Sequence, residues 1–143
     1  MEILCISLLS LFVTQFLKLF LNRPFYIKRI ISTGGMPSSH AAFVSTLSTK
    51  IALKYGFYSD AFAAVAVFSS IIIYDAGGLR RNVGQQASIL KKIINYFSLV
   101  EKEEFRGAVA NDLKELVGHT PFEVFVGVLL GIAIALLSEF CRN

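Results

Sequence analysis

The chain is organised around one stretch, Ser32-Thr-Gly-Gly-Met-Pro-Ser-Ser-His40, which precedes an apolar segment that begins at about Ala41. Its glycines permit close approach of a ligand to the backbone, and Pro37 suits the first turn of a helix. With Ser38 or Ser39 as N-cap, such a helix presents free N–H groups and a positive dipole end to a phosphate or another oxyanion. His40 would lie beside that anion as a proton donor or acceptor. The alternative is a capped helix start with a polar histidine at a membrane interface.

Composition indicates that the solvent of this chain is a lipid bilayer. Hydrophobic residues make up 55% of the 143 residues, mean hydropathy is +0.63, and 17% of residues are charged. Soluble domains are about 45–50% apolar. The excess lies in four segments, near 3–21, 41–57, 60–76 and 121–138, each close to the roughly 20 residues that span a bilayer. The sequence therefore predicts an all-α polytopic membrane helix bundle with about four spanning helices, as one domain over residues 1–143.

The segment at 3–21 lacks the basic start and small-residue cleavage pattern of a signal peptide, so we expect a retained membrane helix. Ser59 is the expected N-cap of the third segment, which should end at Asp75-Ala-Gly-Gly with a left-handed glycine. Thr120-Pro-Phe-Glu123 forms a capping box that starts the fourth segment. Lys50 and Lys54, late in the second segment, are expected to extend to the membrane surface.

The polar region at 77–119 predicts one or two amphipathic helices on or near the membrane. The first, at 85–97, has apolar residues at helical spacing opposite Lys91 and Lys92. The second, at about 99–117, begins at the capping-box pattern Ser98-Leu-Val-Glu101.

The charge and cysteine content exclude some partners. A net charge of +4 without a long basic run fits anionic head groups or phosphorylated substrates, and nucleic acid is not an expected partner. Cys5 and Cys141 lie near opposite chain ends without metal-ligand spacing, so they are interpreted as packing residues, with a disulfide as the alternative. The sequence predicts no metal, no cofactor and no particular oligomeric state.

Four crossings would bring the polar motifs to one membrane face, because the loops after the first and third segments emerge on the same side. The residues gathered there are Lys18, Arg23, Ser32–His40, Asp75–Arg81 and Gly118–Glu123. The second and fourth helices also point their positive N-terminal dipoles at this face. The sequence therefore predicts a cation-lined anion site.

Each member of this set has a simpler interpretation. Lys18 can extend to the membrane surface, Arg23 can be a positive flank, and Arg80 and Arg81 can anchor to head groups. Asp75 can orient an arginine, and Glu123 can serve its cap alone.

Two histidines beside an anion site favour phosphoryl transfer. One imidazole, His119 or His40, would attack phosphorus to give a phosphohistidine, and the other would protonate the leaving oxygen. Cations would stabilise the equatorial oxygens.

These residues resemble the type-2 phosphatidic acid phosphatase superfamily, which includes the vanadium-dependent haloperoxidases. That superfamily carries the blocks K-x6-R-P, P-S-G-H and S-R-x5-H-x3-D. The blocks at Thr33–His40, Asp75–Ala87 and Gly118–Glu123 are similar to its divergent bacterial and plant branch, and the similarity covers essentially the whole chain.

The resemblance implies that His119 is the nucleophile, Glu123 its orienting acid and His40 the general acid. Ser38 and Ser39 lie in the phosphate-binding block, together with Lys18 and Arg23 from the first block. Three departures stand out: four residues separate Lys18 from Arg23, Ser39 replaces a glycine, and Asp112-Leu113 replaces S-R. Arg80 or Arg81 is the candidate to replace the missing arginine.

The leading hypothesis is a membrane-embedded, metal-independent phosphatase that hydrolyses a lipid phosphate or pyrophosphate. The alternatives are a non-catalytic membrane protein that binds phosphate or anionic lipid, and a vanadate-dependent haloperoxidase. The expected location is the bacterial inner membrane or an organellar membrane. Basic residues on the motif-bearing face favour the cytoplasmic side, whereas typical superfamily members work on the outer side.

Overall fold

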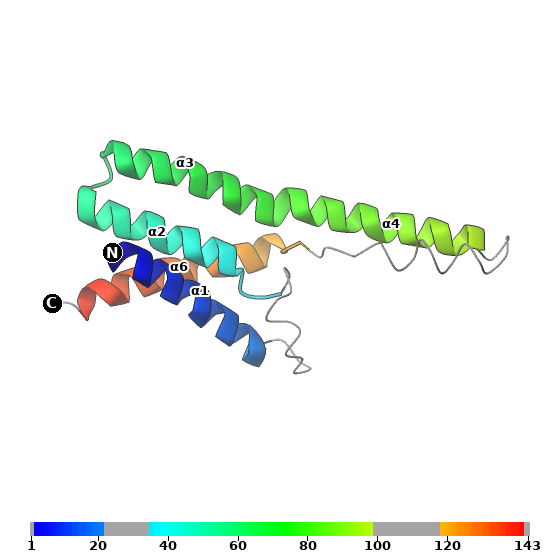
Figure 1. Cartoon of the computed structure of the whole chain (residues 1–143), viewed down its shortest axis with the longest axis horizontal. Helices are drawn as coiled ribbons and strands as arrows, with labels where there is room; N and C mark the ends of the chain where they lie inside the picture. Colours follow the sequence, from blue (N-terminus) through cyan, green and yellow to red (C-terminus); the bar gives the residue numbers. More distant parts are fainter. Residues whose placement is uncertain (1, 22–34, 99–117, 142–143) are drawn as a thin grey trace.

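The computed structural model describes residues 2–21, 35–98 and 118–141, which form helices joined by short loops, without a strand in these ranges (Figure 1). The predicted residue Arg23, the predicted helix at 99–117 and the Asp112-Leu113 departure lie outside the described residues. The elements are α1 (Glu2–Leu21), α2 (Ser39–Tyr55), α3 (Asp60–Tyr74), the π-helical η2 (Asp75–Leu79), α4 (Arg80–Ser98) and α6 (Pro121–Phe140).

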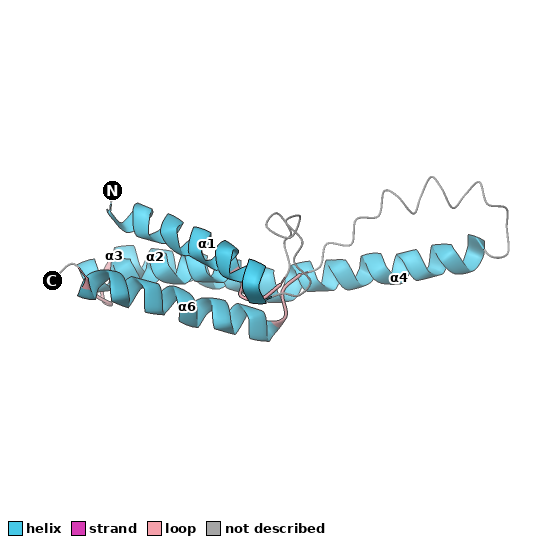
Figure 2. Cartoon of the chain, turned by 90° about the horizontal axis from the view of Figure 1, so that it is seen from below, coloured by secondary structure: helices cyan, strands magenta, loops and turns pink. Residues whose placement is uncertain are grey.

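Helix α2 is the centre of the bundle, because α1, α3 and α6 all pack against it. Figures 1 and 2 show these helices side by side, with both chain ends at the same end of the bundle. The N-terminus of α2, the N-terminus of α6 and the C-terminus of α1 therefore lie together at the other end.

The polarity of the bundle is inverted relative to a soluble protein. The buried residues of α1 are polar and follow one helical stripe: Ser7, Ser10, Thr14 and Lys18. Most of its exposed residues are large and apolar, among them Leu9, Phe12, Phe16 and Phe20. The buried hydroxyl groups donate to backbone carbonyls of their own helix. A polar interior under an apolar surface is the distribution that a hydrocarbon solvent favours.

Helix α6 approaches α2 closely through glycines. A Cβ atom at Gly127 would lie 2.4 Å from the carbonyl oxygen of Ser38, and one at Gly131 would lie 2.3 Å from that of Ala42. Thr46 Oγ1 lies 2.9 Å from the carbonyl oxygens of both Ala42 and Gly131. This G-x-x-x-G contact lets the two backbones touch, as small residues do in membrane helix pairs.

Gly131→Ala should destabilise the protein by about 1–3 kcal/mol, because the added methyl group overlaps the α2 backbone and the helices must separate. Thermal unfolding of the detergent-solubilised protein measures the effect. Gly78→Ala is the matched control, since its Cβ would meet its nearest neighbour, Tyr74 Cζ, at an ordinary 3.9 Å. Equal unfolding temperatures for the two variants would contradict the close contact.

The chain does not break at Gly77 and Gly78. Neither glycine has a positive φ, and α3 continues through η2 into α4 as one long rod (Figure 1). The prediction of a left-handed glycine cap here is wrong. A glycine cap does occur at Gly56, whose φ of 87° ends α2.

Within the described ranges, two helices are long and apolar enough to cross a membrane: the continuous Asp60–Ile94 and Pro121–Phe140. A helix of 35 residues is about 52 Å long, well beyond a hydrocarbon layer of roughly 30 Å. Only part of the rod therefore fits within such a layer.

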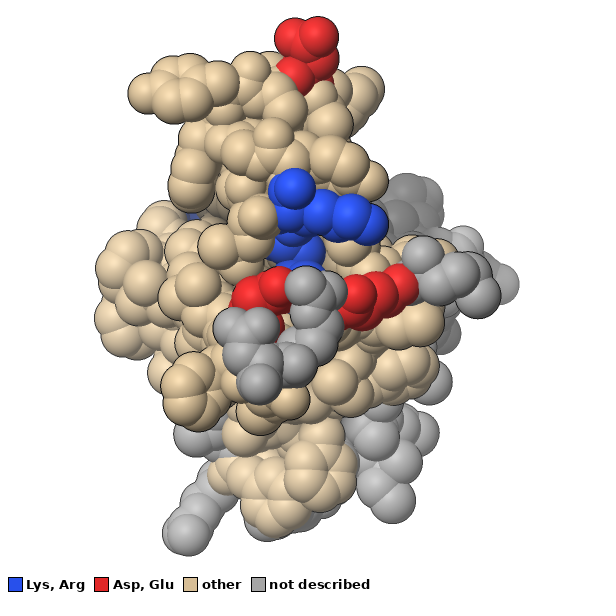
Figure 3. All heavy atoms as spheres, turned by 90° about the vertical axis from the view of Figure 1, so that its left-hand side faces the viewer, with Lys and Arg blue, Asp and Glu red and all other residues tan. Residues whose placement is uncertain are grey.

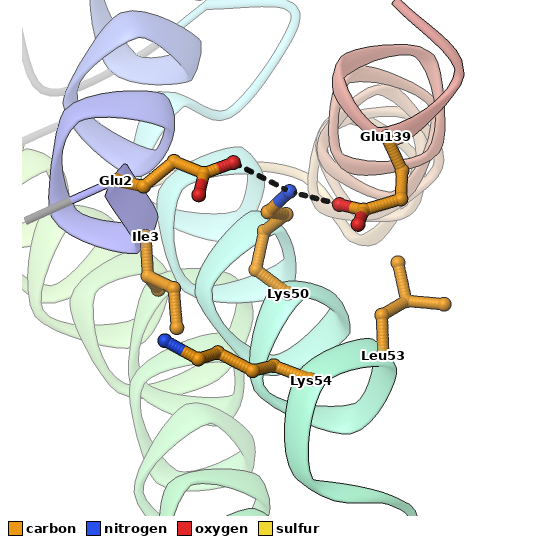
Figure 4. A pocket seen from close by; sticks show the side chains of 6 residues that line it. All are labelled: Glu2, Ile3, Lys50, Leu53, Lys54 and Glu139. Carbon is orange, nitrogen blue, oxygen red and sulfur yellow. Dashed lines mark hydrogen bonds and ion pairs between the residues drawn. The ribbon is translucent and has the colours of Figure 1, made fainter. Parts of the chain in front are cut away.

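A buried charge cluster joins three helices at the end that carries the chain termini. Lys50 on α2 is 3% exposed, pairs with Glu139 of α6 and lies 3.9 Å from Glu2 of α1. Figure 3 shows the lysines between acidic side chains at this end, and Figure 4 shows the small pocket around them. The prediction that Lys50 extends to the membrane surface is wrong, because its side chain is buried and is held by Glu2 and Glu139, whose own side chains are 48% and 32% exposed.

The predicted caps at Ser59 and Thr120 are confirmed: each side-chain oxygen accepts from the backbone N–H three residues later, and Thr120 forms the complete capping box. Ser38 is the N-cap of α2, so the helix begins at Ser39 and Pro37 lies before the cap. Cys5 and Cys141 are exposed and unpaired, which contradicts their interpretation as packing residues.

Candidate active site

The first component of the site is a buried lysine. Lys18, in the last turn of α1, is 4% exposed, and its Nζ donates to Ser39 Oγ at 3.4 Å. The interpretation of Lys18 as a residue that extends to the membrane surface is therefore wrong. The ammonium group lies at the first residue of α2, where its charge adds to the positive end of the helix dipole.

The second component is the pair formed by His119 and Glu123. His119 is 2% exposed, and its Nδ1 lies 3.3 Å from Glu123 Oε2. The same carboxylate oxygen accepts from the backbone N–H of Thr120 at 3.0 Å. Glu123 therefore has two roles: it caps α6 and it orients the histidine. A carboxylate only accepts, so the proton of a neutral His119 resides on Nδ1 and the lone pair on Nε2. Among the described residues, the buried Nε2 has no hydrogen-bond partner.

Backbone hydrogen bonds hold these components together. The N–H of Ser38 donates to the carbonyl of Glu123 at 3.0 Å, which joins the start of α2 to the first turn of α6. The N–H of His119 donates to the carbonyl of Ala76 at 3.2 Å, which joins the same loop to η2. Ser38 Oγ accepts from the backbone N–H of Ala41, so the side chain of Ser38 caps α2. The backbone N–H of the same residue connects α2 to α6.

The electrostatics favour a neutral His119. Burial lowers its pKa from the usual 6.5, and the charges of Lys18 and, more weakly, His40 lower it further. The hydrogen bond to Glu123 and the charge of that carboxylate oppose the shift. A histidine with a pKa below 6.5 is mostly unprotonated at pH 7, which is the state required of a nucleophile.

The remaining predicted residues lie around this cluster. His40 is exposed in the first turn of α2, close enough for its charge to act on His119. Asp75 begins η2 beside Ala76, and whether it orients an arginine stays a prediction. Arg80 begins α4, and Arg81 is exposed in its first turn. Within the described ranges, no three His, Cys, Asp or Glu side chains gather as metal ligands.

Two structural contributors were missed by the sequence analysis. The buried stripe of α1 is visible in the sequence as small polar residues three or four positions apart that lead to Lys18. The second is Gly127-Val-Leu-Leu-Gly131, which brings the N-termini of α2 and α6 together. Both signals are periodic patterns within apolar segments.

Comparison with known proteins agrees with the motifs. Residues 1–134 match the family described as "Divergent PAP2 family". The chain belongs to this family. It is also 44% identical over 117 residues to "Uncharacterized membrane protein YuiD" of Bacillus subtilis (strain 168), a match that covers 78% of this chain and 74% of that protein. No solved structure matches the chain significantly.

The residues that match the divergent PAP2 family include the motif blocks around His40 and His119. Together with the two apolar helices and the inverted polarity of the bundle, membership of this family supports a membrane protein related to phosphatases.

Proposed function

We propose that this protein is a membrane-embedded phosphatase that hydrolyses a lipid phosphate or pyrophosphate through a phosphohistidine on His119. The observation that carries the proposal is the buried, unpartnered Nε2 of His119, oriented by Glu123 and adjoining the buried Lys18. A histidine held in one tautomer with its lone pair directed away from its orienting acid is the arrangement that a nucleophile requires.

In the proposed reaction, His119 Nε2 attacks phosphorus, and the bond from phosphorus to the leaving oxygen breaks. His40 donates a proton to that oxygen, so the lipid leaves as an alcohol or, from a pyrophosphate, as a monophosphate. His40 then takes a proton from water, whose oxygen attacks the phosphohistidine and releases phosphate. Lys18, Ser39 and the N-terminus of α2 stabilise the equatorial oxygens, with Arg23, Arg80 and Arg81 as further candidates.

The proposal includes four membrane crossings, by α1, α2, α3 and α6. It is supported by the packing of all four helices side by side with both chain ends at one end. In this arrangement the site lies at one membrane face, where a lipid head group is located. The positive-inside rule favours the cytoplasmic face.

Trapping of the covalent intermediate tests the proposal. Protein in phosphatidylcholine vesicles is mixed with ³²P-labelled phosphatidic acid or isoprenoid phosphate and quenched in alkali, which preserves phosphohistidine. The expected result is label on the peptide that contains His119, with phosphate release above that of a His40→Ala, His119→Ala double variant.

Absence of both label and phosphate release would reject catalysis. If His40→Gln and His119→Gln also kept phosphate binding and biological function, the non-catalytic anion-binding alternative would replace the proposal. Vanadate inhibition without halide oxidation would separate a phosphatase from a haloperoxidase.

A further inference from the structure

An apolar groove of about 440 Å³ lies where α3 and α6 pack on α2. Its large side chains are Leu53, Phe57, Phe62, Ile73, Ile132 and Leu136. Hydroxyl groups also line it, and four of them form hydrogen bonds within the protein. Ser48 and Ser69 bond to each other at 2.8 Å, and Thr49 and Ser70 donate to carbonyls in their own helices. The groove therefore offers a mainly apolar surface to a ligand.

The groove is elongated: it follows α3 from Phe62 to Ile73, which is about 16 Å at 1.5 Å per residue. An extended hydrocarbon chain is far thinner than a helix about 10 Å wide, so it matches the long apolar shape of the groove better than a helix does.

One end of the groove adjoins the candidate active site. Ile73 lines the groove and packs against the buried cluster of Ala41, Ala76 and Val124. Ala76 accepts the backbone hydrogen bond of His119, and Val124 follows Glu123 in α6. At the far end, Phe57 and Phe62 form an edge-to-face pair with ring centroids 5.2 Å apart. The groove thus extends along the bundle from Ile73, which packs on the apolar cluster next to the candidate site, to this aromatic pair.

We propose that the groove between α3 and α6 binds the hydrocarbon chain of the lipid phosphate whose phosphate group is bound beside His119. The inference rests on the proposed function and makes its substrate class specific: a single-headed phosphate on a long, flexible chain. The chain lies along α3 within the thickness of the bilayer, so the substrate reaches the site without leaving the membrane.

Photolabelling tests the groove without requiring turnover. The probe is hexadecylphosphonate, which cannot be hydrolysed, with a diazirine near the chain end, in phosphatidylcholine vesicles. The expected label is on the peptide around Phe62. Ala66→Phe fills the groove and should reduce this label about 10-fold, whereas Ala64→Phe, on the exposed opposite face of α3, should leave it unchanged.

Kinetics of the same two variants give a second measurement. Ala66→Phe should raise KM for hexadecyl phosphate about 10-fold, and Ala64→Phe should not. Neither variant should change the hydrolysis of butyl phosphate, whose chain is too short to occupy the groove.

Labelling of α1 as strong as that of the peptide around Phe62 would overturn the inference, and so would label that persists in Ala66→Phe. So would a cross-linked dimer that Ala66→Phe dissociates, because a second copy would then occupy the groove. Correct labelling without any hydrolysis would support the chain site and reject the phosphatase, so the two failures are distinguishable.

Discussion

His119→Asn should reduce phosphate release by about 10⁴-fold or more and abolish the covalent intermediate, because it removes the proposed nucleophile. Asparagine is chosen because its side-chain amide can still donate to Glu123 Oε2, as Nδ1 does now at 3.3 Å. The capping box of α6 does not use the imidazole, so the start of the helix should be preserved. Phosphate release and ³²P trapping measure the loss, and thermal unfolding verifies that the variant is folded.

His40→Asn provides the comparison that separates the two histidines. A general acid matters most when the leaving oxygen is a poor leaving group. His40→Asn should therefore lose about 10²-fold or more on an alkyl phosphate but retain most of its phosphohistidine formation from p-nitrophenyl phosphate. Trapped label in His119→Asn, or none in His40→Asn, would reverse the assignment of the two roles.

Local signals in the sequence predicted the helix starts well. The caps at Ser59 and at Thr120 with Glu123 are local: their hydrogen bonds join residues three positions apart in the same chain segment. The glycine pair at Gly77 and Gly78 was misread for the opposite reason. Tertiary contacts decide this stretch: the carbonyl of Ala76 accepts from His119, and a Cβ at Gly77 would lie 3.3 Å from Val124 Cγ2, so the glycine allows α6 to approach and does not end the helix. The resulting rod carries Arg81 to an exposed position in α4.

The candidate site could be predicted in outline but not in its contacts. The loop order placed Lys18, His40 and His119 at one end, because that follows from the direction of successive helices. Burial of Lys18 depends on which face of α1 meets α2, and this is set by the small polar stripe rather than by the lysine itself. Lys50 illustrates the same limit, since Glu2 and Glu139 meet it from opposite ends of the sequence.

Lys18→Met should reduce kcat/KM by about 10²-fold, because it removes a cation from the proposed phosphoryl site. It should not destabilise the fold, since a buried charge is replaced by an apolar side chain of similar length. Lys54→Met is the matched control: Lys54 is exposed near the opposite end of α2, and its replacement should change neither quantity.

The pH profile of Lys18→Met distinguishes a lysine that acts on the site from one that only packs. The charge of Lys18 lowers the pKa of His119, so its removal should raise that pKa toward the usual 6.5. The proposed nucleophile is the neutral imidazole of His119, so activity should fall as pH decreases through the His119 pKa. The acidic limb of kcat/KM should consequently move to higher pH in Lys18→Met and stay in place in Lys54→Met. A rate loss without this movement would mean that Lys18 lies too far from His119 to share one phosphoryl group with it.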